Sequence, residues 1–243
     1  MDLIGKTALV TGSGIRLGKA ISLALAQKGV NLALHFHSSA DEVQEVLMEV
    51  KALGVKAKTF QSDISVQGAA VKLSKDVVSW AGHYDILINN AAIYLPGNGA
   101  KITQSALSKE FQINLFSPLL LTQQFAAQLP EGAFGKVINI ADAKVYKTGS
   151  DHFAYRLTKM GIIEMTRMFA MELAPHITVN AIAPGIMMPI AGFEHINIQE
   201  VAERKIPLKR PGSPEIIAQN VLHILDQDFM TGNIIVVDGG ESL

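Results

Sequence analysis

The chain contains no cysteine among its 243 residues, and this absence removes several kinds of chemistry. Without thiols there is no disulfide framework, no thiolate nucleophile and no metal site built on cysteine ligands. Aromatic residues are scarce, at 6% of the chain, and charged residues reach only 18%. Hydrophobic residues make up 49%, so the composition is that of a folded protein and excludes extensive disorder.

Neither sign of charge is in excess. Lys and Arg number 21 against 22 for Asp and Glu, so no positive field attracts nucleic acid or acidic membranes. The longest uncharged stretch, residues 111–130, contains Asn114, Pro118 and four glutamines, which are unsuited to a membrane span. The first residues lack the basic and then apolar pattern of a secretory signal. We therefore expect a cytoplasmic protein that acts on a small molecule and binds neither nucleic acid nor membrane.

Short apolar runs rich in β-branched residues alternate with helix-length segments that have a 3.6-residue hydrophobic period. This alternation predicts an α/β fold with a doubly wound parallel sheet of about seven strands and helices on both faces. The predicted strands are Thr7–Val10, Asn31–Phe36, Ala57–Phe60, Ile86–Ile88, Val137–Ile140, Thr178–Ile182 and Ile234–Val237. The predicted helices include Leu17–Gln27, Ala40–Leu53, Ala69–Trp80, Phe153–Leu173 and Pro214–Leu225. We expect one domain over residues 1–243, with residues 186–206, which lack the alternation, as a substrate loop.

The first predicted strand leads into a glycine-rich turn, Thr11-Gly12-Ser13-Gly14-Ile15-Arg16-Leu17-Gly18, and a helix follows at once. Glycines let backbone amides and a helix N-terminus approach a pyrophosphate, because no Cβ intervenes and the helix dipole favours negative charge. The turn is typical of a Rossmann-like dinucleotide site, although a purely structural tight turn is the simpler alternative. A Walker loop is excluded, since Ala20 follows Lys19 where Ser or Thr would bind magnesium. The predicted cofactor contacts here are Gly12, Gly14, Arg16, Leu17 and Gly18.

No carboxylate ends the second predicted strand, which closes with His35-Phe36-His37-Ser38-Ser39. In a dinucleotide fold an acidic residue at this place binds the ribose hydroxyls and selects NAD. Its absence, with Arg16, His37, Ser38 and Ser39 nearby, favours a 2′-phosphate and therefore NADPH. Two simpler alternatives remain: the histidines only occupy a strand end, or they bind a metal. Because no third ligand is in sight, we expect no metal.

A tyrosine and a lysine follow the fifth predicted strand at helical spacing. Tyr155 and Lys159 are four residues apart, and Tyr155 comes thirteen residues after Asp142. Residues at this spacing share a helix face, so the phenol and the ammonium can converge on one point. This arrangement is typical of a proton donor, with a solvated surface pair as the simpler alternative.

With these motifs in place, the chain resembles the short-chain dehydrogenase/reductase family from Gly5 to Gly240. The resemblance is carried by the glycine-rich turn, Asp63-Ile64, Asn89-Asn90-Ala91-Ala92, Asn114, Tyr155 with Lys159, Pro184-Gly185 and Arg210-Pro211-Gly212. It implies further cofactor contacts at Asp63, Ile64, Asn90, Ala91, Ala92, Tyr155, Lys159, Pro184 and Gly185. It also implies that Asn114 and Lys159 support a proton-relay water and that Lys159 holds the nicotinamide ribose. A homotetramer built through helices around residues 105–129 and 153–173 is a further implication.

Two departures from the family pattern resemble its pteridine reductase branch, which includes the dihydromonapterin reductases. Arg16 replaces the usual middle glycine of the turn, and Asp142 replaces the usual serine before the tyrosine. The run Gly149-Ser150-Asp151-His152 also resembles the dihydromonapterin reductases. Tyr94 stands where that branch places an aromatic ring against the pterin, with ordinary pocket lining as the alternative.

The chemistry of residue 142 limits the substrate. A serine hydroxyl can donate to a ketone oxygen, whereas an ionised carboxylate only accepts and would repel a developing alkoxide. The Asp142 carboxylate suits a ligand edge with N–H donors, such as the amino-pyrimidine side of a pterin, with Arg16 offsetting its charge. Its charge would raise the pKa of the Tyr155 hydroxyl while Lys159 would lower it, so the proton stays available. A capping or loop role for Asp142 is the alternative.

We therefore predict an NADPH-dependent reductase of dihydropterins, namely dihydromonapterin or dihydrobiopterin, with dihydrofolate as a further candidate. Tyr155 would donate the proton, Asp142 and Arg16 would orient the ring, and Tyr94 would stack on it. Met187, close to the place where the family keeps a threonine after Pro-Gly, is expected to line the substrate pocket. Two other functions stay open: a carbonyl or 3-oxoacyl-thioester reductase in which a protonated Asp142 donates, and a non-catalytic NADPH-binding regulator.

Overall fold

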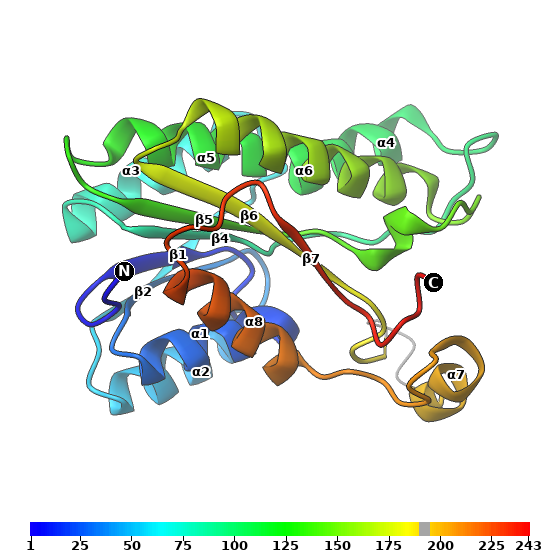
Figure 1. Ribbon diagram of the computed structural model, residues 1–243. Helices are drawn as coiled ribbons and strands as arrows, with labels where there is room; N and C mark the ends of the chain where they lie inside the picture. Colours follow the sequence, from blue (N-terminus) through cyan, green and yellow to red (C-terminus); the bar gives the residue numbers. More distant parts are fainter. Residues whose placement is uncertain (190–194) are drawn as a thin grey trace.

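Seven strands form one sheet in the computed structural model, which describes residues 1–189 and 195–243. Their order is β3-β2-β1-β4-β5-β6-β7, and every neighbouring pair is parallel. Helices cover both faces of this sheet (Figure 1), so the predicted doubly wound α/β fold is confirmed. The strands are β1 (Thr7–Val10), β2 (Asn31–Phe36), β3 (Ala57–Gln61), β4 (Ile86–Asn89), β5 (Gly135–Ile140), β6 (Ile177–Pro184) and β7 (Ile234–Val237).

Two hydrophobic cores lie on the two faces of the sheet, because successive side chains along a strand point to opposite sides. In β1, Ala8 and Val10 pack into one core and Leu9 packs into the other. The first core is covered by α1 (Arg16–Gln27), α2 (Ala40–Ala52) and α8 (Pro214–Asp226). The second is covered by α3 (Ala69–Ala81), α5 (Ser117–Gln128) and α6 (Phe153–Glu172).

The hydrophobic period of each helix decides which of its faces is buried. In α2, for example, the buried residues are Val43, Val46 and Val50, which lie three and four positions apart on one stripe. All the helices and strands predicted from the sequence are present, with closely matching ends. None of the helices in the described ranges is long and apolar enough to cross a membrane.

Several short elements were not predicted. They are the π-helical turn η1 (Gln112–Phe116), the 3₁₀ turn η2 (Ala143–Tyr146) and α7 (Ile198–Lys205), whereas α4 (Gln104–Phe111) and α5 lie where the resemblance implies helices. Helix α7 occupies the second half of residues 186–206, and the function of this segment as a substrate loop stays a prediction. Helix α7 has only one buried residue, Ala202, so its sequence lacks a wide apolar stripe. Residues 190–194 of the predicted loop lie outside the described residues.

The strand order reverses at β1, which pairs with β2 on one side and with β4 on the other. In open parallel sheets the crevice outside the carboxyl ends of the strands at such a reversal is where ligands bind. Here the backbone N–H of Thr11 donates to the Ile88 carbonyl (3.0 Å), and the Thr11 hydroxyl accepts the N–H of Asn90 (2.9 Å). The segments that leave β1 and β4 are thus joined at this crevice.

Candidate active site

The glycine-rich turn after β1 packs so closely that only glycine fits at two positions. At Gly12 φ is +64°, and an added Cβ would lie 3.1 Å from the Ala91 Cα. At Gly18 a Cβ would lie 1.9 Å from the Gly12 carbonyl oxygen. The Asn90 side-chain amide donates to the carbonyls of Thr11 (2.8 Å) and Gly12 (3.1 Å). The turn is thus fixed at the N-terminus of α1, where backbone amides and the helix dipole favour a pyrophosphate.

His35 braces this turn from β2. Its Nδ1 accepts the Gly12 N–H (3.2 Å), so its Nε2 carries the proton and donates to the Ser62 carbonyl (3.0 Å). Burial lowers the pKa of His35 to about 4, and the imidazole is therefore neutral at physiological pH. His35 therefore has a structural role in the turn, which agrees with the interpretation that it only occupies a strand end. The described residues contain no cluster suited to a metal ion.

The residues predicted to hold the adenosine end lie beside the same turn. An added Cβ at Gly14 would come within 2.7 Å of the Ser39 hydroxyl, so these two residues are in direct contact. His37 and Ser38 are exposed at the end of β2, and His37 Nε2 lies 3.6 Å from Asp63 Oδ2. The Ser65 hydroxyl and N–H hold the pKa of the Asp63 carboxyl below its usual value. Their contact with a cofactor stays a prediction.

Of the five remaining predicted cofactor contacts, one lies at the start of α1 and four lie at or after the end of a strand at this edge of the sheet. These residues are Leu17, Ile64, Ala92, Pro184 and Gly185. Gly185 donates its N–H to the Val237 carbonyl (2.9 Å), and an added Cβ there would lie 2.9 Å from Glu241 Oε2. The chain is therefore tightly packed where β6 and β7 end.

Tyr155 and Asp142 form the central contact of the site. The Tyr155 hydroxyl donates to Asp142 Oδ2 (2.7 Å), and Asp142 Oδ1 accepts the backbone N–H of Lys144 (2.7 Å). Asp142 is thus both the cap of η2 and the partner of the phenol, and its contact with a substrate stays a prediction. Lys159, four residues along α6, donates to the Ile140 carbonyl (2.6 Å), with its ammonium 5.6 Å from the Tyr155 ring centre.

Burial is the main cause of the pKa shifts of Tyr155 and Lys159. It raises the pKa of the Tyr155 hydroxyl well above 10, and the neighbouring Asp142 charge raises it further. Burial also lowers the pKa of Lys159 to about 8, and Asp142 opposes that shift. Tyr155 therefore keeps its proton at neutral pH and can act as a donor.

Asn114 lies in the π-helical turn η1 and binds the chain that leaves β4. Its Oδ1 accepts the Ile93 N–H (2.8 Å), and its Nδ2 donates to the Ile93 carbonyl (2.9 Å). The predicted relay water between Asn114 and Lys159 stays a prediction. A π-helical turn is common at functional sites because it redirects a side chain out of the regular helix ladder.

The structure brings Tyr94 against Tyr155, with ring centres 4.7 Å apart and planes at 90°. The Tyr94 ring also stacks on the His152 imidazole, with centres 3.7 Å apart and planes at 15°. The Tyr94 hydroxyl accepts a hydrogen bond from the Lys144 ammonium. Tyr94 is thus a wall of the site, while its stacking on a substrate stays a prediction.

Arg16 and Met187 are placed differently from the other predicted substrate contacts. Arg16 adopts φ of +55° and donates from its guanidinium to the Pro189 carbonyl (2.7 Å), so it connects the turn to the segment after β6. Met187 is 9% exposed, belongs to the first hydrophobic core and packs on Gly212. Packing in the core accounts for Met187, whose role in substrate binding is left as a prediction.

The sequence motifs did not single out Lys144, Glu110 or Glu241, and they included His152 only as the last residue of the run Gly149–His152. Lys144 and His152 flank the predicted Tyr94 only in space, and the sequence carried no signal for that contact. Burial raises the pKa of Glu241, whose Oε2 accepts the Ile186 N–H (3.2 Å), and the nearby Asp142 charge also raises it. The two carboxylates therefore lie near the same end of the sheet.

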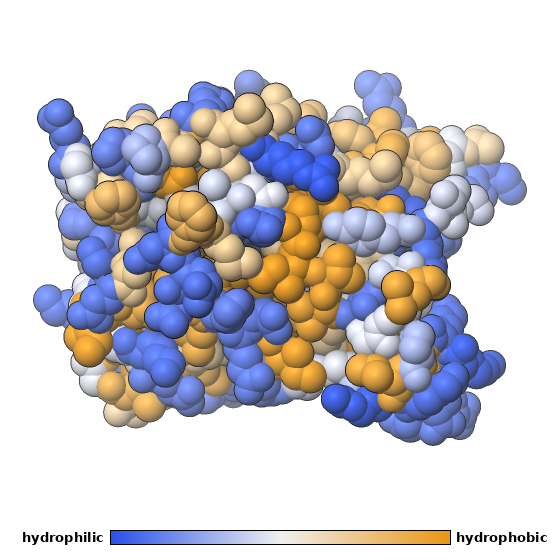
Figure 2. Space-filling view, in the orientation of Figure 1, coloured by the Kyte–Doolittle hydropathy of each residue, from blue (hydrophilic) through white to orange (hydrophobic). Residues whose placement is uncertain are grey.

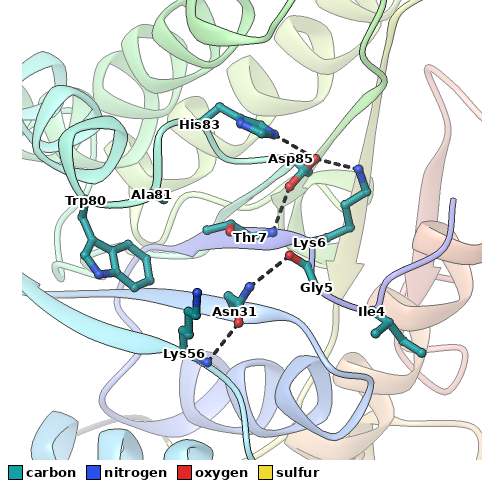
Figure 3. Close-up of a pocket in the computed structure, with 10 residues that line it drawn as sticks. All are labelled: Ile4, Gly5, Lys6, Thr7, Asn31, Lys56, Trp80, Ala81, His83 and Asp85. Atoms are coloured by element: carbon teal, nitrogen blue, oxygen red, sulfur yellow. Dashed lines mark hydrogen bonds and ion pairs between the residues drawn. The ribbon is translucent and has the colours of Figure 1, made fainter.

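A pocket of 440 Å³ lies at the opposite, amino edge of the sheet (Figure 3). Its polar groups satisfy one another. Asp85 accepts from the Lys6 ammonium and from the Thr7 N–H, both at 2.9 Å. Asn31 donates to the Gly5 carbonyl and accepts the backbone N–H of Lys56. These contacts close the start of the sheet and leave the carboxyl edge as the candidate active site.

A family model described as enoyl-(acyl carrier protein) reductase matches residues 12–242. The 3-oxoacyl-(acyl-carrier-protein) reductase FabG of Staphylococcus epidermidis is 31% identical over 241 residues, which cover 98% of this chain and 99% of FabG. The chain belongs to the short-chain dehydrogenase/reductase family. The family resemblance seen in the sequence is confirmed.

Solved structures of short-chain dehydrogenases/reductases superpose on the whole chain. FolM alternative dihydrofolate reductase 1 of Brucella canis, complexed with NADP, is 30% identical, with a TM-score of 0.91. The match covers 100% of this chain and 96% of FolM. A short-chain dehydrogenase/reductase of Serratia marcescens is 26% identical over the full length of both chains, with a TM-score of 0.93. The chain therefore has both the fold and the sequence pattern of an oxidoreductase family.

Proposed function

We propose that this protein is an NADPH-dependent reductase of dihydropterins, with dihydromonapterin and dihydrobiopterin as the first candidates and dihydrofolate as another. The observation that carries the proposal is the 2.7 Å hydrogen bond from the Tyr155 hydroxyl to Asp142. Both oxygens of Asp142 accept hydrogen bonds from the protein, as an ionised carboxylate does. Such a group attracts the N–H edge of a heterocycle and disfavours a developing alkoxide.

The proton side of the reaction follows from this geometry. NADPH, when bound, supplies a hydride to the carbon of a ring C=N bond. Tyr155 gives its proton to the adjacent nitrogen, so the bond becomes CH–NH and the dihydropterin leaves as a tetrahydropterin. The Lys159 ammonium lies 5.6 Å from the centre of the Tyr155 ring and has a pKa of about 8, and we propose that it helps return a proton to Tyr155. Asp142 keeps the phenol protonated between turnovers.

The residues at the carboxyl edge fit a phosphorylated dinucleotide. The close packing at Gly12 and Gly18 fixes the turn at the start of α1, where backbone amides and the helix dipole favour a pyrophosphate. No carboxylate ends β2, where His37, Ser38 and Ser39 leave room for a 2′-phosphate. The FolM structure, which shares this fold, was solved with NADP. These features support NADPH over NADH as the cofactor.

FabG, at 31% identity, favours a second candidate function, the reduction of a 3-oxoacyl thioester. This reaction needs a donor to the ketone oxygen beside Tyr155, and Asp142 would have to carry a proton to supply it. In the structure Asp142 instead accepts from Tyr155 and from the Lys144 N–H. The pterin reaction therefore fits the site better.

The experiment that separates the two functions measures NADPH oxidation with dihydrobiopterin, dihydromonapterin, dihydrofolate and an acetoacetyl thioester. We expect turnover of at least one dihydropterin and a much lower kcat/KM for the thioester. Turnover of the thioester alone would refute the proposal. A Tyr155→Phe variant serves as the control, since it should bind NADPH normally and lose most of the turnover.

We also propose that the chain forms a homotetramer. Figure 2 shows hydrophobic side chains gathered over β7, the last strand of the sheet, where Val236 is 39% exposed. Helix α6 exposes a second stripe of apolar residues: Leu157, Met160, Met168 and Met171. Two separate apolar surfaces are what a tetramer of twofold symmetry needs. Sedimentation should give four chains, and a Met168→Glu variant should dissociate; a monomeric wild-type protein would contradict this assembly.

A further inference from the structure

The chain that leaves β4 carries Tyr94 in a segment without regular secondary structure, residues 93–95, which we call the Tyr94 segment. Its backbone is nevertheless held at each end. Asn114 binds both the N–H and the carbonyl of Ile93. Glu110 Oε1 accepts the Leu95 N–H (3.0 Å), and His152 Nδ1 donates to the Leu95 carbonyl (2.9 Å). Holding a loop in one conformation costs backbone entropy, and these hydrogen bonds offset that cost. They therefore fix the position of Tyr94.

Glu110 and Asn114 lie four residues apart, at the end of α4 and in η1, so they address the segment from one helical face. Glu110 is only 1% exposed, and no ion pair to it occurs within residues 1–189 and 195–243. Burying a carboxylate without a cation costs free energy that an apolar side chain would avoid. Burial accordingly raises the pKa of Glu110, an effect that the Leu95 N–H opposes. Within the described residues, the hydrogen bond from the Leu95 N–H to Glu110 is the contact that compensates this cost.

His152 holds the segment from the opposite side, just before α6. It adopts φ 48° and ψ 50°, a left-handed conformation that is unfavourable for a side chain with a Cβ. In this conformation its ring stacks on Tyr94 while its Nδ1 reaches the Leu95 carbonyl. The Lys144 ammonium lies 4.9 Å from the centre of the same Tyr94 ring and donates to its hydroxyl. Strained backbone of this kind is typical of functional sites.

From these contacts we propose that Glu110 and His152 are positioning residues that hold the Tyr94 ring at a right angle to Tyr155. With ring centres at 4.7 Å, this arrangement sets the space beside the Tyr155 hydroxyl. The inference rests on the proposed function in one respect only, that Tyr155 donates the proton. It does not depend on which substrate is reduced. Site geometry of this kind has to hold within about 0.5 Å, which an unbraced loop does not provide.

The test uses paired variants that separate each contact. Glu110→Leu removes the acceptor for Leu95, while Glu110→Gln keeps an acceptor oxygen. His152→Phe keeps the stacked ring and loses the bond to Leu95, while His152→Asn suits the left-handed backbone and loses the ring. His223→Asn, on the exposed side of α8, is the matched control for a histidine substitution.

We expect Glu110→Leu and both His152 variants to lower kcat/KM at least tenfold, because misplaced groups cost up to about 100-fold. The dissociation constant of NADPH should stay within twofold, and Glu110→Gln should recover most of the loss. Hydrogen exchange of the amides at residues 93–95 should be faster in Glu110→Leu and His152→Phe by tenfold or more. His223→Asn should match the wild type in every measurement.

Two outcomes would overturn the inference. In one, hydrogen exchange at residues 93–95 becomes faster while kcat/KM stays within twofold, so turnover does not need the braced segment. In the other, NADPH affinity and thermal stability fall together with kcat/KM, which indicates a general structural role. If the wild-type protein reduces only the thioester, the dihydropterin proposal fails, and the same variants are measured with the thioester.

Discussion

Among single residues, Asp142 and Lys159 bring opposite charges into the space around Tyr155. Asp142 accepts the Tyr155 hydroxyl, and Lys159 donates to the Ile140 carbonyl. Burying charged groups is expensive even when they are hydrogen-bonded, so an apolar core of the same volume would be more stable. Sites that keep such groups generally do so for their chemistry.

This cost makes Lys159→Met a test in which stability and activity should change in opposite directions. The pKa of Lys159 falls to about 8 in the folded protein from 10.5, so at pH 7 its buried ammonium opposes folding. Between pH 8 and 10.5 the unfolded chain binds more protons than the folded protein does, so the contribution of Lys159 to the free energy of unfolding rises with pH. We expect Lys159→Met to raise the free energy of unfolding at pH 7 by about 1–3 kcal/mol and to abolish most turnover. Urea denaturation checks this, and a destabilised variant would contradict it.

At the scale of elements, the turn between β1 and α1 combines glycines that are required with one arginine that is strained. Arg16 adopts φ of +55°, where glycine is the residue normally found. The left-handed conformation costs it roughly 1–2 kcal/mol. Its bond to the Pro189 carbonyl links the turn to the segment after β6. This strain supports a role in binding for Arg16.

Arg16→Gly should leave the free energy of unfolding within about 1 kcal/mol of wild type, because relief of strain offsets the greater freedom of glycine in the unfolded chain. The affinity for NADPH should fall about tenfold with the loss of the guanidinium. Lys209→Gly is the matched control, since Lys209 has φ of +58° outside the turn. It should leave NADPH affinity unchanged. A large loss of stability in Arg16→Gly would show that the arginine serves the fold.

His35 should make the β1–α1 turn sensitive to acid. Its pKa is about 4 in the folded protein and 6.5 in the unfolded chain, so between these values the unfolded state binds more protons. The contribution of His35 to the free energy of unfolding is complete above pH 6.5 and falls by about 3 kcal/mol as the pH drops to 4. In His35→Asn this part of the pH dependence should disappear, and in His37→Asn it should remain, because His37 is exposed. Thermal denaturation at several pH values measures both; an unchanged slope in His35→Asn would contradict the assignment.

Strands such as β1 and β2 could be predicted exactly because both faces of this sheet are buried, which leaves continuous apolar runs in the sequence. Helix α7 could not, because it buries only Ala202. In the site, Tyr155 and Lys159 are four residues apart on one helix, so their proximity follows from helix geometry. The stacking of Tyr94 on His152 joins residues 58 positions apart, and only the folded chain brings them together.

For the whole molecule, binding of the cofactor should stabilise the folded state. A ligand that binds only the folded state stabilises it by about 2.7 kcal/mol at one hundred times its dissociation constant. We expect saturating NADPH to raise Tm by several degrees and NADH at the same concentration to raise it much less, since no carboxylate at residues 35–39 selects NAD. Thermal shift assays with both cofactors measure this. Equal shifts would contradict the cofactor assignment.

The proposed function depends on the Asp142 carboxylate beside Tyr155, which we propose selects a nitrogen heterocycle over a ketone. The most direct measurement is the ratio of kcat/KM for dihydrobiopterin or dihydromonapterin to kcat/KM for an acetoacetyl thioester, in wild type and in Asp142→Ser. Removing the carboxylate takes away the acceptor for N–H groups and supplies a donor for a ketone oxygen. We expect a high ratio in the wild type that falls about 100-fold or more in the variant. A ratio that does not change, or one that rises, would contradict it.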